Sequence, residues 1–183
     1  MGLKADPYIY VHPDKKIGLN FQKAFTFSTW VQINSRSNIE DAAWPLVQGD
    51  SVDHFQFAFY WTPGGADLIL NKDSENEFWP KRSLKPRVEV QNHDWQHWVV
   101  TYDYKKVKIY FNGQLDFQAD YEQALPDLDK VDLSIGAASN YFISNEEFKS
   151  FRYVDRMRGM MDEVRIYDRA LAPEEVTQLY EYK

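Results

Sequence analysis

The sequence contains no cysteine among its 183 residues. Without thiols the chain forms no disulfides and offers no thiolate as a nucleophile or metal ligand. No apolar run approaches the roughly 20 residues that a bilayer-spanning helix requires. Basic residues are in the minority, with 21 Lys and Arg against 28 Asp and Glu, so the formal net charge is −7. The acidic balance disfavours nucleic acid as a partner, and the sequence predicts no insertion into a membrane.

Motifs of hydrolytic catalysis are also missing. The sequence has no Gly-x-Ser-x-Gly nucleophile elbow and no run of alternating acidic residues that would set two carboxylates about 5 Å apart on a strand, as retaining glycosidases need. The nearest acidic cluster, Lys72–Phe78, is rich in loop-type residues and is interpreted as a solvated loop. His93 and His97 are four residues apart but flank the start of a strand, so a metal pair is not expected there. His97 is interpreted as structural.

Aromatic residues, in contrast, make up 16% of the chain. They recur in short runs that alternate with polar residues, as in Ala24–Asn34, where Phe25, Phe27 and Val31 share one face. Asn112-Gly113 is predicted to be a hairpin turn, because type I′ turns need positive φ at both central residues. Many such runs, separated by Asn, Asp, Gly and Pro, predict an all-β sandwich or barrel.

Strands are predicted at Tyr8–Val11, Ala24–Asn34, Pro45–Gly49, His54–Trp61, Ala66–Asn71, Trp95–Tyr104, Val107–Leu115 and Val131–Ala137. Loops are predicted at Ser35–Trp44, Lys72–Glu89 and Ala138–Arg158, and a tight turn at Asp103–Lys106.

The chain ends with "GMMDEVRIYDRALAPEEVTQLYE", which predicts a strand followed directly by a helix over Pro173–Tyr182. Proline suits the first helical position, and Glu174 and Glu175 suit the positive end of the helix dipole. Val176 and Leu179 recur at helical spacing. We expect this helix to pack as a lid over one end of the β-domain.

Five segments in order resemble the laminin-G-like jelly roll of the concanavalin A-like lectin/glucanase superfamily. They are "FTFSTWVQ", "WQHWVVTYD", "KIYFNGQL", "SIGA" and the final "GMMDEVRIYDRALAPEEVTQLYE". The resemblance implies one domain over residues 1–183, a jelly-roll sandwich of two antiparallel sheets with a short C-terminal helix. It also implies that the last strand, Asp162–Tyr167, lies beside Tyr8–Val11. The laminarinase-like enzymes of this superfamily carry an E-x-D-x-x-E run on a central strand, and this sequence lacks such a run.

Carbohydrate binding is the function that the remaining residues favour. Sugar sites pair an aromatic platform with polar side chains that bind hydroxyls. Several aromatic residues fall in predicted loops or at a strand end, where burial is not required, and polar residues lie near them in the sequence. The predicted ligand residues are Trp79, Trp61, Tyr141, Tyr153, Asn71, Asp73, Arg82, Asn140, Arg152 and Arg156. Anchoring of the loops to the core is the alternative for each aromatic residue, and Trp30, Trp95 and Trp98 are assigned to the core or the sheets.

Calcium is the metal that the resemblance implies. Asp162 stands where many relatives place an aspartate beside the ion, and carboxylates are ligands that Ca²⁺ prefers. The alternative is that Asp162 only hydrogen-bonds a neighbouring loop. Asp50 and Asp53 form a second, weaker candidate.

We therefore predict a non-catalytic carbohydrate-binding or adhesion module that binds a polysaccharide or glycoconjugate. The Met-Gly start lacks the features of a signal peptide and is interpreted as an addition before a mature domain. The phrase "RALAPEEV" resembles the bacterial branch of the family, so an extracellular, cell-surface or periplasmic setting within a larger bacterial protein is expected. A structural or protein-interaction domain and a diverged hydrolase or lyase are the alternatives.

Overall fold

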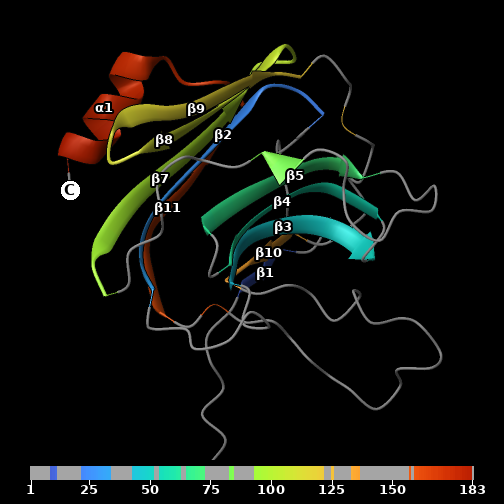
Figure 1. The fold of residues 1–183 in the computed structure, drawn as a ribbon, viewed down its shortest axis with the longest axis horizontal. Helices are drawn as coiled ribbons and strands as arrows, with labels where there is room; N and C mark the ends of the chain where they lie inside the picture. Colours follow the sequence, from blue (N-terminus) through green and yellow to red (C-terminus); the bar gives the residue numbers. More distant parts are fainter. Residues whose placement is uncertain are drawn as a thin grey trace, which may run out of the picture.

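A computed structural model describes residues 9–11, 22–33, 43–51, 54–62, 65–72, 83–84, 93–121, 125, 133–136, 157 and 159–182. In these ranges the strands form a six-stranded antiparallel sheet, in the order β1-β10-β3-β4-β5-β6, and a five-stranded antiparallel sheet, in the order β11-β2-β7-β8-β9. The two sheets face each other across the core (Figure 1). The predicted two-sheet jelly-roll sandwich is therefore confirmed.

The six-stranded sheet consists of β1 (Ile9–Val11), β3 (Ala43–Ser51), β4 (His54–Thr62), β5 (Gly65–Lys72), β6 (Ser83–Leu84) and β10 (Leu133–Ile135). The five-stranded sheet consists of β2 (Phe25–Ile33), β7 (Trp95–Tyr102), β8 (Lys106–Phe111), β9 (Gln114–Asp120) and β11 (Gly159–Tyr167), and the helix is α1 (Pro173–Glu181). β3 begins inside the loop predicted at Ser35–Trp44, and β6 lies inside the loop predicted at Lys72–Glu89. The loop predicted at Ala138–Arg158 falls outside the described residues except for Met157.

Aromatic side chains join the two sheets in the core. The rings of Phe25 in β2 and Phe57 in β4 stack with centroids 5.3 Å apart. Further along, Trp98 in β7 meets Phe59 in β4 at 5.8 Å. Each fully buried side chain of this size stabilises the fold by roughly 1.5–3 kcal/mol relative to exposure, so the alternation seen in the sequence is what holds the sandwich closed.

Both predicted tight turns are confirmed. Asn112 and Gly113 have φ values of 49° and 79° and connect β8 to β9. Between β7 and β8, the backbone N–H of Asp103 donates to the carbonyl of Lys106 at 3.2 Å. Tyr104, inside that turn, has a φ of 72°.

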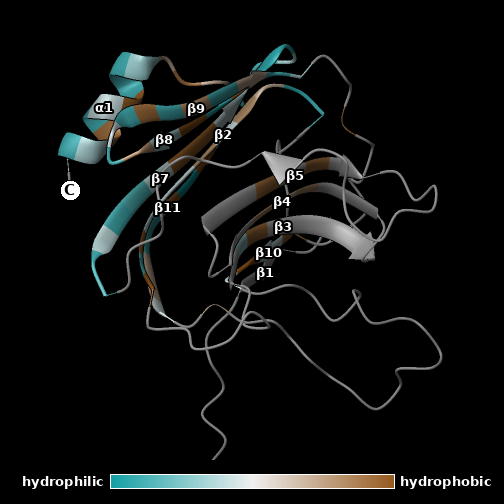
Figure 2. Ribbon diagram, in the orientation of Figure 1, coloured by the Kyte–Doolittle hydropathy of each residue, from teal (hydrophilic) through white to brown (hydrophobic). Residues whose placement is uncertain are grey.

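The final helix lies on the outer face of the five-stranded sheet (Figure 1), and the expectation that it covers one end of the domain is wrong. Val176 is fully buried against Val99 in β7 and Tyr110 in β8. Figure 2 shows how hydrophobic and hydrophilic residues alternate along α1. The helix takes this place because Val99 and Tyr110 put an apolar patch on the outer face of β7 and β8, and a second layer removes that patch from water.

The last strand does not lie beside the first. β11 pairs with β2, where Ile166 is opposite Phe27, whereas β1 pairs with β10 in the other sheet. The short connection from β11 to α1 explains this difference, because a strand that leads directly into the helix must belong to the sheet that the helix covers. No helix in the described part of the chain is long and apolar enough to cross a membrane.

Candidate ligand and metal sites

Most of the predicted ligand residues fall in segments that the structure does not describe. Trp79, Tyr141, Tyr153, Asp73, Arg82, Asn140, Arg152 and Arg156 all lie outside the described residues. Trp61 and Asn71 are placed, in β4 and β5 of the six-stranded sheet. The other predicted ligand residues belong to the segments 73–82 and 137–156. For these segments, the structure gives the positions of the described residues on either side.

Trp61 and Asn71 lie at opposite ends of the β4–β5 hairpin. Trp61 pairs with Ala66 beside the hairpin turn, whereas Lys72, the neighbour of Asn71, pairs with Phe55 at the far end. Five residues separate Ala66 from Asn71, which corresponds to about 17 Å along a strand. A single sugar ring is far shorter than this, so the two residues do not belong to one monosaccharide site.

Gly136 and Met157, the described residues on either side of 137–156, lie at the Trp61 end of the sheet. The N–H of Gly136 donates to the carbonyl of Pro45 at 3.2 Å. The N–H of Met157 donates to the carbonyl of Gly136 at 2.9 Å. Because Pro45 precedes Leu46, the partner of Phe59, Gly136 and Met157 both lie close to Trp61.

The described residues next to 73–82 are Lys72, at the other end of the hairpin, and Ser83, which pairs with Ile69 in β5. By their order in the sequence, we name two groups of predicted ligand residues, of which the structure places only Trp61 and Asn71. The Trp61 group is Trp61 with Asn140, Tyr141, Arg152, Tyr153 and Arg156 of the segment 137–156, and the Asn71 group is Asn71 with Asp73, Trp79 and Arg82 of the segment 73–82.

Asp162, the predicted calcium ligand, lies on an irregular part of β11. Pairing with β2 is regular up to Asp162 and resumes at Arg165, so the strand bulges between them. The carboxylate Oδ1 of Asp162 accepts the N–H of Glu163 at 2.8 Å, and Glu163 has a φ of 51°. Glu163 also forms an ion pair with Arg165. The observed hydrogen bond stabilises the bulge itself, rather than a neighbouring loop.

Within the described ranges, no three His, Cys, Asp or Glu side chains gather in a way that could hold a metal ion. Asp162 is exposed, so its carboxylate is accessible to an ion whose remaining ligands come from carbonyls or other segments. Calcium binding at Asp162 stays a prediction. Of the second candidate pair, Asp50 lies in β3 and Asp53 is outside the described residues.

Ser28 and His97 form a hydrogen bond of 3.0 Å between Oγ and Nε2. This is the geometry of a nucleophile and its base, but both residues are fully buried. The rings of Trp30 and Tyr180 lie 5.1 and 6.0 Å from the imidazole. Burial, together with the positive charge of Arg165, lowers the pKa of His97 from 6.5 to about 4, so the imidazole is neutral at physiological pH. The pair is sealed beneath α1, in agreement with a structural His97.

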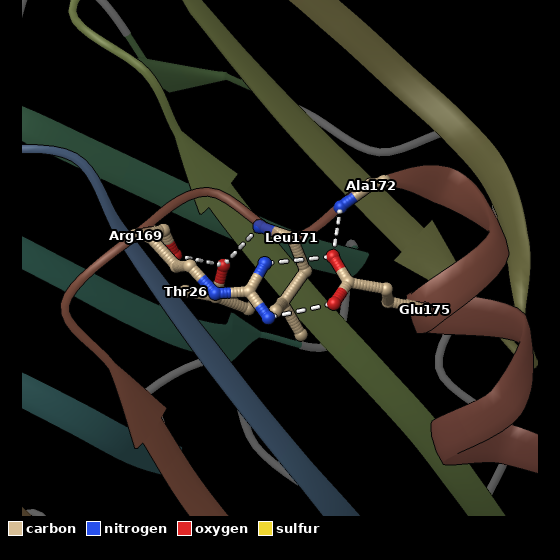
Figure 3. A network of polar contacts seen from close by, with 5 residues as sticks. All are labelled: Thr26, Arg169, Leu171, Ala172 and Glu175. Carbon is tan, nitrogen blue, oxygen red and sulfur yellow. Dashed lines mark hydrogen bonds and ion pairs between the residues drawn. The ribbon is translucent and has the colours of Figure 1, made fainter.

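A polar network that the sequence did not predict fixes α1 to the sheet (Figure 3). The hydroxyl of Thr26 donates to the carbonyl of Arg169 at 2.8 Å and accepts the N–H of Leu171 at 2.9 Å. The guanidinium of Arg169 binds both carboxylate oxygens of Glu175, at 2.6 and 2.7 Å. Glu175 also accepts the N–H of Ala172 at 2.9 Å. These bonds lower the pKa of Glu175 from 4.5 to about 2. One feature of the sequence could have predicted the bond between Glu175 and Ala172. A glutamate at the third position of a helix commonly accepts the N–H of the residue that precedes the helix.

A model of the concanavalin A-like lectin/glucanases superfamily, of the laminin G type, matches residues 3–177 of the chain. A search among curated proteins finds no relative whose sequence matches.

Several solved structures share the fold. The receptor binding domain of botulinum neurotoxin C/D mosaic serotype has a TM-score of 0.66 and 15% identity, with 96% of this chain and 40% of that chain covered. A Bacteroides ovatus protein for which carbohydrate binding is proposed has a TM-score of 0.60 and 17% identity, covering 93% and 44%. A sialidase from Trypanosoma rangeli has a TM-score of 0.59 and 16% identity, covering 87% and 23%. The chain thus spans less than half of each of these proteins, and the likeness is one of fold.

Proposed function

Because the chain belongs to the concanavalin A-like lectin/glucanases superfamily, we propose that it is a non-catalytic carbohydrate-binding or adhesion module. The observation that carries this proposal is the family match over residues 3–177, nearly the whole chain. Fold alone does not give function, so the proposal also rests on where the structure leaves surface for a ligand.

The arrangement of the layers supports binding at the six-stranded sheet. The helix α1 occupies the outer face of the five-stranded sheet, so the region under it is closed to a ligand. Both Trp61 and Asn71, the predicted ligand residues that the structure places, belong to the six-stranded sheet instead. Their positions at opposite ends of the β4–β5 hairpin suit an extended glycan or two separate glycan sites.

The chemistry of the two groups suits sugars. Aromatic rings stack on the apolar C–H faces of pyranose rings, and Asn, Asp and Arg side chains bind the hydroxyls. In the Trp61 group, Arg152 and Arg156 provide two guanidinium groups, which bind carboxylates and sulfates in a bidentate manner. We propose that this group prefers uronic or sulfated sugars. A calcium ion at Asp162 is part of the same proposal.

Two observations support a binding role rather than catalysis. Ser28 and His97 are sealed from solvent, and the sequence carries no alternating run of carboxylates on a strand. The sialidase shows that this fold can be part of an enzyme, but the match covers only 23% of that chain. A diverged hydrolase or lyase is therefore not the function we propose.

We further propose that the module works outside the bacterial cytoplasm, at the cell surface, in the extracellular space or in the periplasm, within a larger protein. The chain covers only 44% of the Bacteroides ovatus protein that shares its fold, which supports a place within a larger protein.

The test is a glycan array with the purified protein, performed with calcium and again with a chelator. Wild type is expected to bind at least one glycan class, and Trp79→Ala and Arg152→Ala are each expected to weaken binding. Tyr182→Ala is the matched control, because Tyr182 is 77% exposed at the end of α1, far from both groups in the sequence. Failure to bind neutral, acidic and sulfated glycans would refute the proposal.

A protein-interaction domain is the second candidate. Leu115 in β9 and Tyr182 after α1 are large hydrophobic side chains that are 49% and 77% exposed, and exposed apolar side chains are common at protein interfaces. Size-exclusion chromatography with light scattering would detect self-association. An array-negative protein that self-associates, and whose Leu115→Ser variant does not, would favour this function.

A further inference from the structure

The β7–β8 turn carries an aromatic side chain where turn chemistry favours glycine or asparagine. Tyr104 has a φ of 72°, and left-handed backbone is unfavourable for bulky residues. The neighbouring β8–β9 turn meets the same requirement with Asn112 and Gly113. A tyrosine in this conformation, with its side chain 48% exposed, is a candidate functional residue, because strained backbone conformations cluster at functional sites.

The turn holds Tyr104 in a fixed position. The carboxylate Oδ1 of Asp103 accepts the N–H groups of Lys105 and Lys106, at 3.0 and 2.7 Å. The carbonyl of Lys105 accepts the N–H of Tyr121 at 2.6 Å. The ammonium group of Lys106 binds the carboxylate of Asp120 at 2.8 Å. The ring is thus presented on a preorganised turn, which reduces the entropy lost on binding.

Buried rings support Tyr104 from the inside. Its ring lies 5.9 Å from that of Tyr102, and Tyr102 contacts Tyr121 at 6.0 Å and Phe25 at 5.8 Å. Tyr102 and Tyr121 are buried, with 0% and 2% exposure. Tyr104 is therefore the outermost ring of an aromatic cluster that reaches into the core, and its exposed side is available for a ligand.

Tyr104 lies at the same end of the sandwich as Asn71. Tyr102 pairs with Phe25 across β7 and β2, and Phe25 stacks on Phe57 of the other sheet. Phe57 is two residues from Phe55, the partner of Lys72. The contacts thus connect the β7–β8 turn to the end of β5 at which Asn71 lies.

We propose that Tyr104 is a stacking platform for one pyranose unit of a glycan, in a subsite at the end of the sandwich where Asn71 lies. The exposed Asp103 and Lys105 precede and follow Tyr104 in the turn, and their charged groups can form hydrogen bonds with hydroxyl groups. Charges of both signs border the platform, which suits an uncharged sugar and not a strongly anionic one. This subsite rests on the proposed function, since it extends the same binding role to a further residue.

The experiment compares wild type, Tyr104→Asn, Tyr104→Phe and the control Tyr182→Asn on the glycan array, with the Tm of each protein measured in parallel. Tyr104→Asn is expected to reduce affinity about tenfold while its Tm stays the same or rises, because Asn tolerates the left-handed turn. Tyr104→Phe keeps the ring and should bind like wild type.

The outcomes separate this inference from the proposed function. If wild type binds glycans and Tyr104→Asn binds them equally, the subsite is refuted while the proposed function stands. If Tyr104→Asn loses both affinity and several degrees of Tm, Tyr104 is structural and the subsite is also refuted. If wild type binds no glycan, the proposed function fails and the subsite with it.

Discussion

The ring of Tyr180 in α1 stacks on the indole of Trp30 in β2, with centroids 5.5 Å apart and an angle of 17° between the planes. The same tyrosine lies over the imidazole of His97 at 6.0 Å. The last turn of the helix therefore closes the polar pair of Ser28 and His97 from above. Through this stack, the final helix contacts the middle of the five-stranded sheet.

Removing this ring should destabilise the fold. Tyr180→Ala is expected to lower the free energy of unfolding by about 1–2 kcal/mol, because it loses an aromatic stack and part of its buried area. The corresponding fall in Tm is about 2–8 °C for a protein of this size. Calorimetry would measure it, with Tyr182→Ala as the control that should leave Tm within about 2 °C. Equal effects of the two substitutions would contradict a specific role of the stack.

The hydroxyl of Thr26 should be required for the connection between β11 and α1. Thr26→Val keeps the shape but leaves the N–H of Leu171, a buried residue, without its acceptor. We expect a loss of about 1–3 kcal/mol in chemical denaturation, the range for a buried donor left unsatisfied. Thr26→Ser retains the hydroxyl and should recover most of the stability. A Val variant as stable as wild type would show that the bond contributes little.

Stability should fall in mild acid because of His97. The folded-state pKa is about 4, below the ordinary 6.5, so the unfolded state binds a proton first as the pH falls. The part of the free energy of unfolding that depends on neutral His97 is fully present above pH 6.5, declines between pH 6.5 and 4, and is lost below pH 4. The total loss is on the order of 3 kcal/mol. Arg165 is the charged group that acts on the imidazole.

Urea denaturation at several pH values would test this dependence. His97→Gln cannot titrate and should be much less sensitive to pH between 6.5 and 4. An unchanged slope of stability against pH between 6.5 and 4 in the Gln variant would exclude His97 as the source of the pH dependence.

Glu175 adds a second dependence at lower pH. Its pKa is lowered to about 2 by Arg169 and Ala172, so it stabilises the fold above pH 4.5 and loses that effect as the pH falls towards 2.

Calcium, if it binds at Asp162, should raise Tm. A ligand at a hundred times its Kd stabilises the folded state by about 2.7 kcal/mol, and Asp162→Asn is expected to abolish that increase. Asp116→Asn, on β9, is the matched control. If Asp162→Asn lowers Tm by the same amount with and without calcium, the carboxylate only stabilises the bulge through Glu163.

Much of the site could not be predicted because it depends on which strands are neighbours. The sequence grouped Trp61 with Asn71 on composition, but the pairing of Ala66 with Trp61 and of Lys72 with Phe55 puts them at opposite ends of a hairpin. Tyr104 gave no signal beyond its position in a turn. Its exposure and its strained φ became visible only with the backbone conformation.

The sequence by itself determined the local structure, namely the alternation in β2, the turn at Asn112-Gly113 and the helix after Ala172, together with the family. These features depend on side-chain period and turn chemistry, which act over a few residues. Only the tertiary structure decided that β11 joins β2, that α1 covers the outer face of its sheet, and that Trp61 and Asn71 lie at opposite ends of a hairpin. Those choices depend on burying surfaces far apart in the chain, and the same local pattern is compatible with several arrangements.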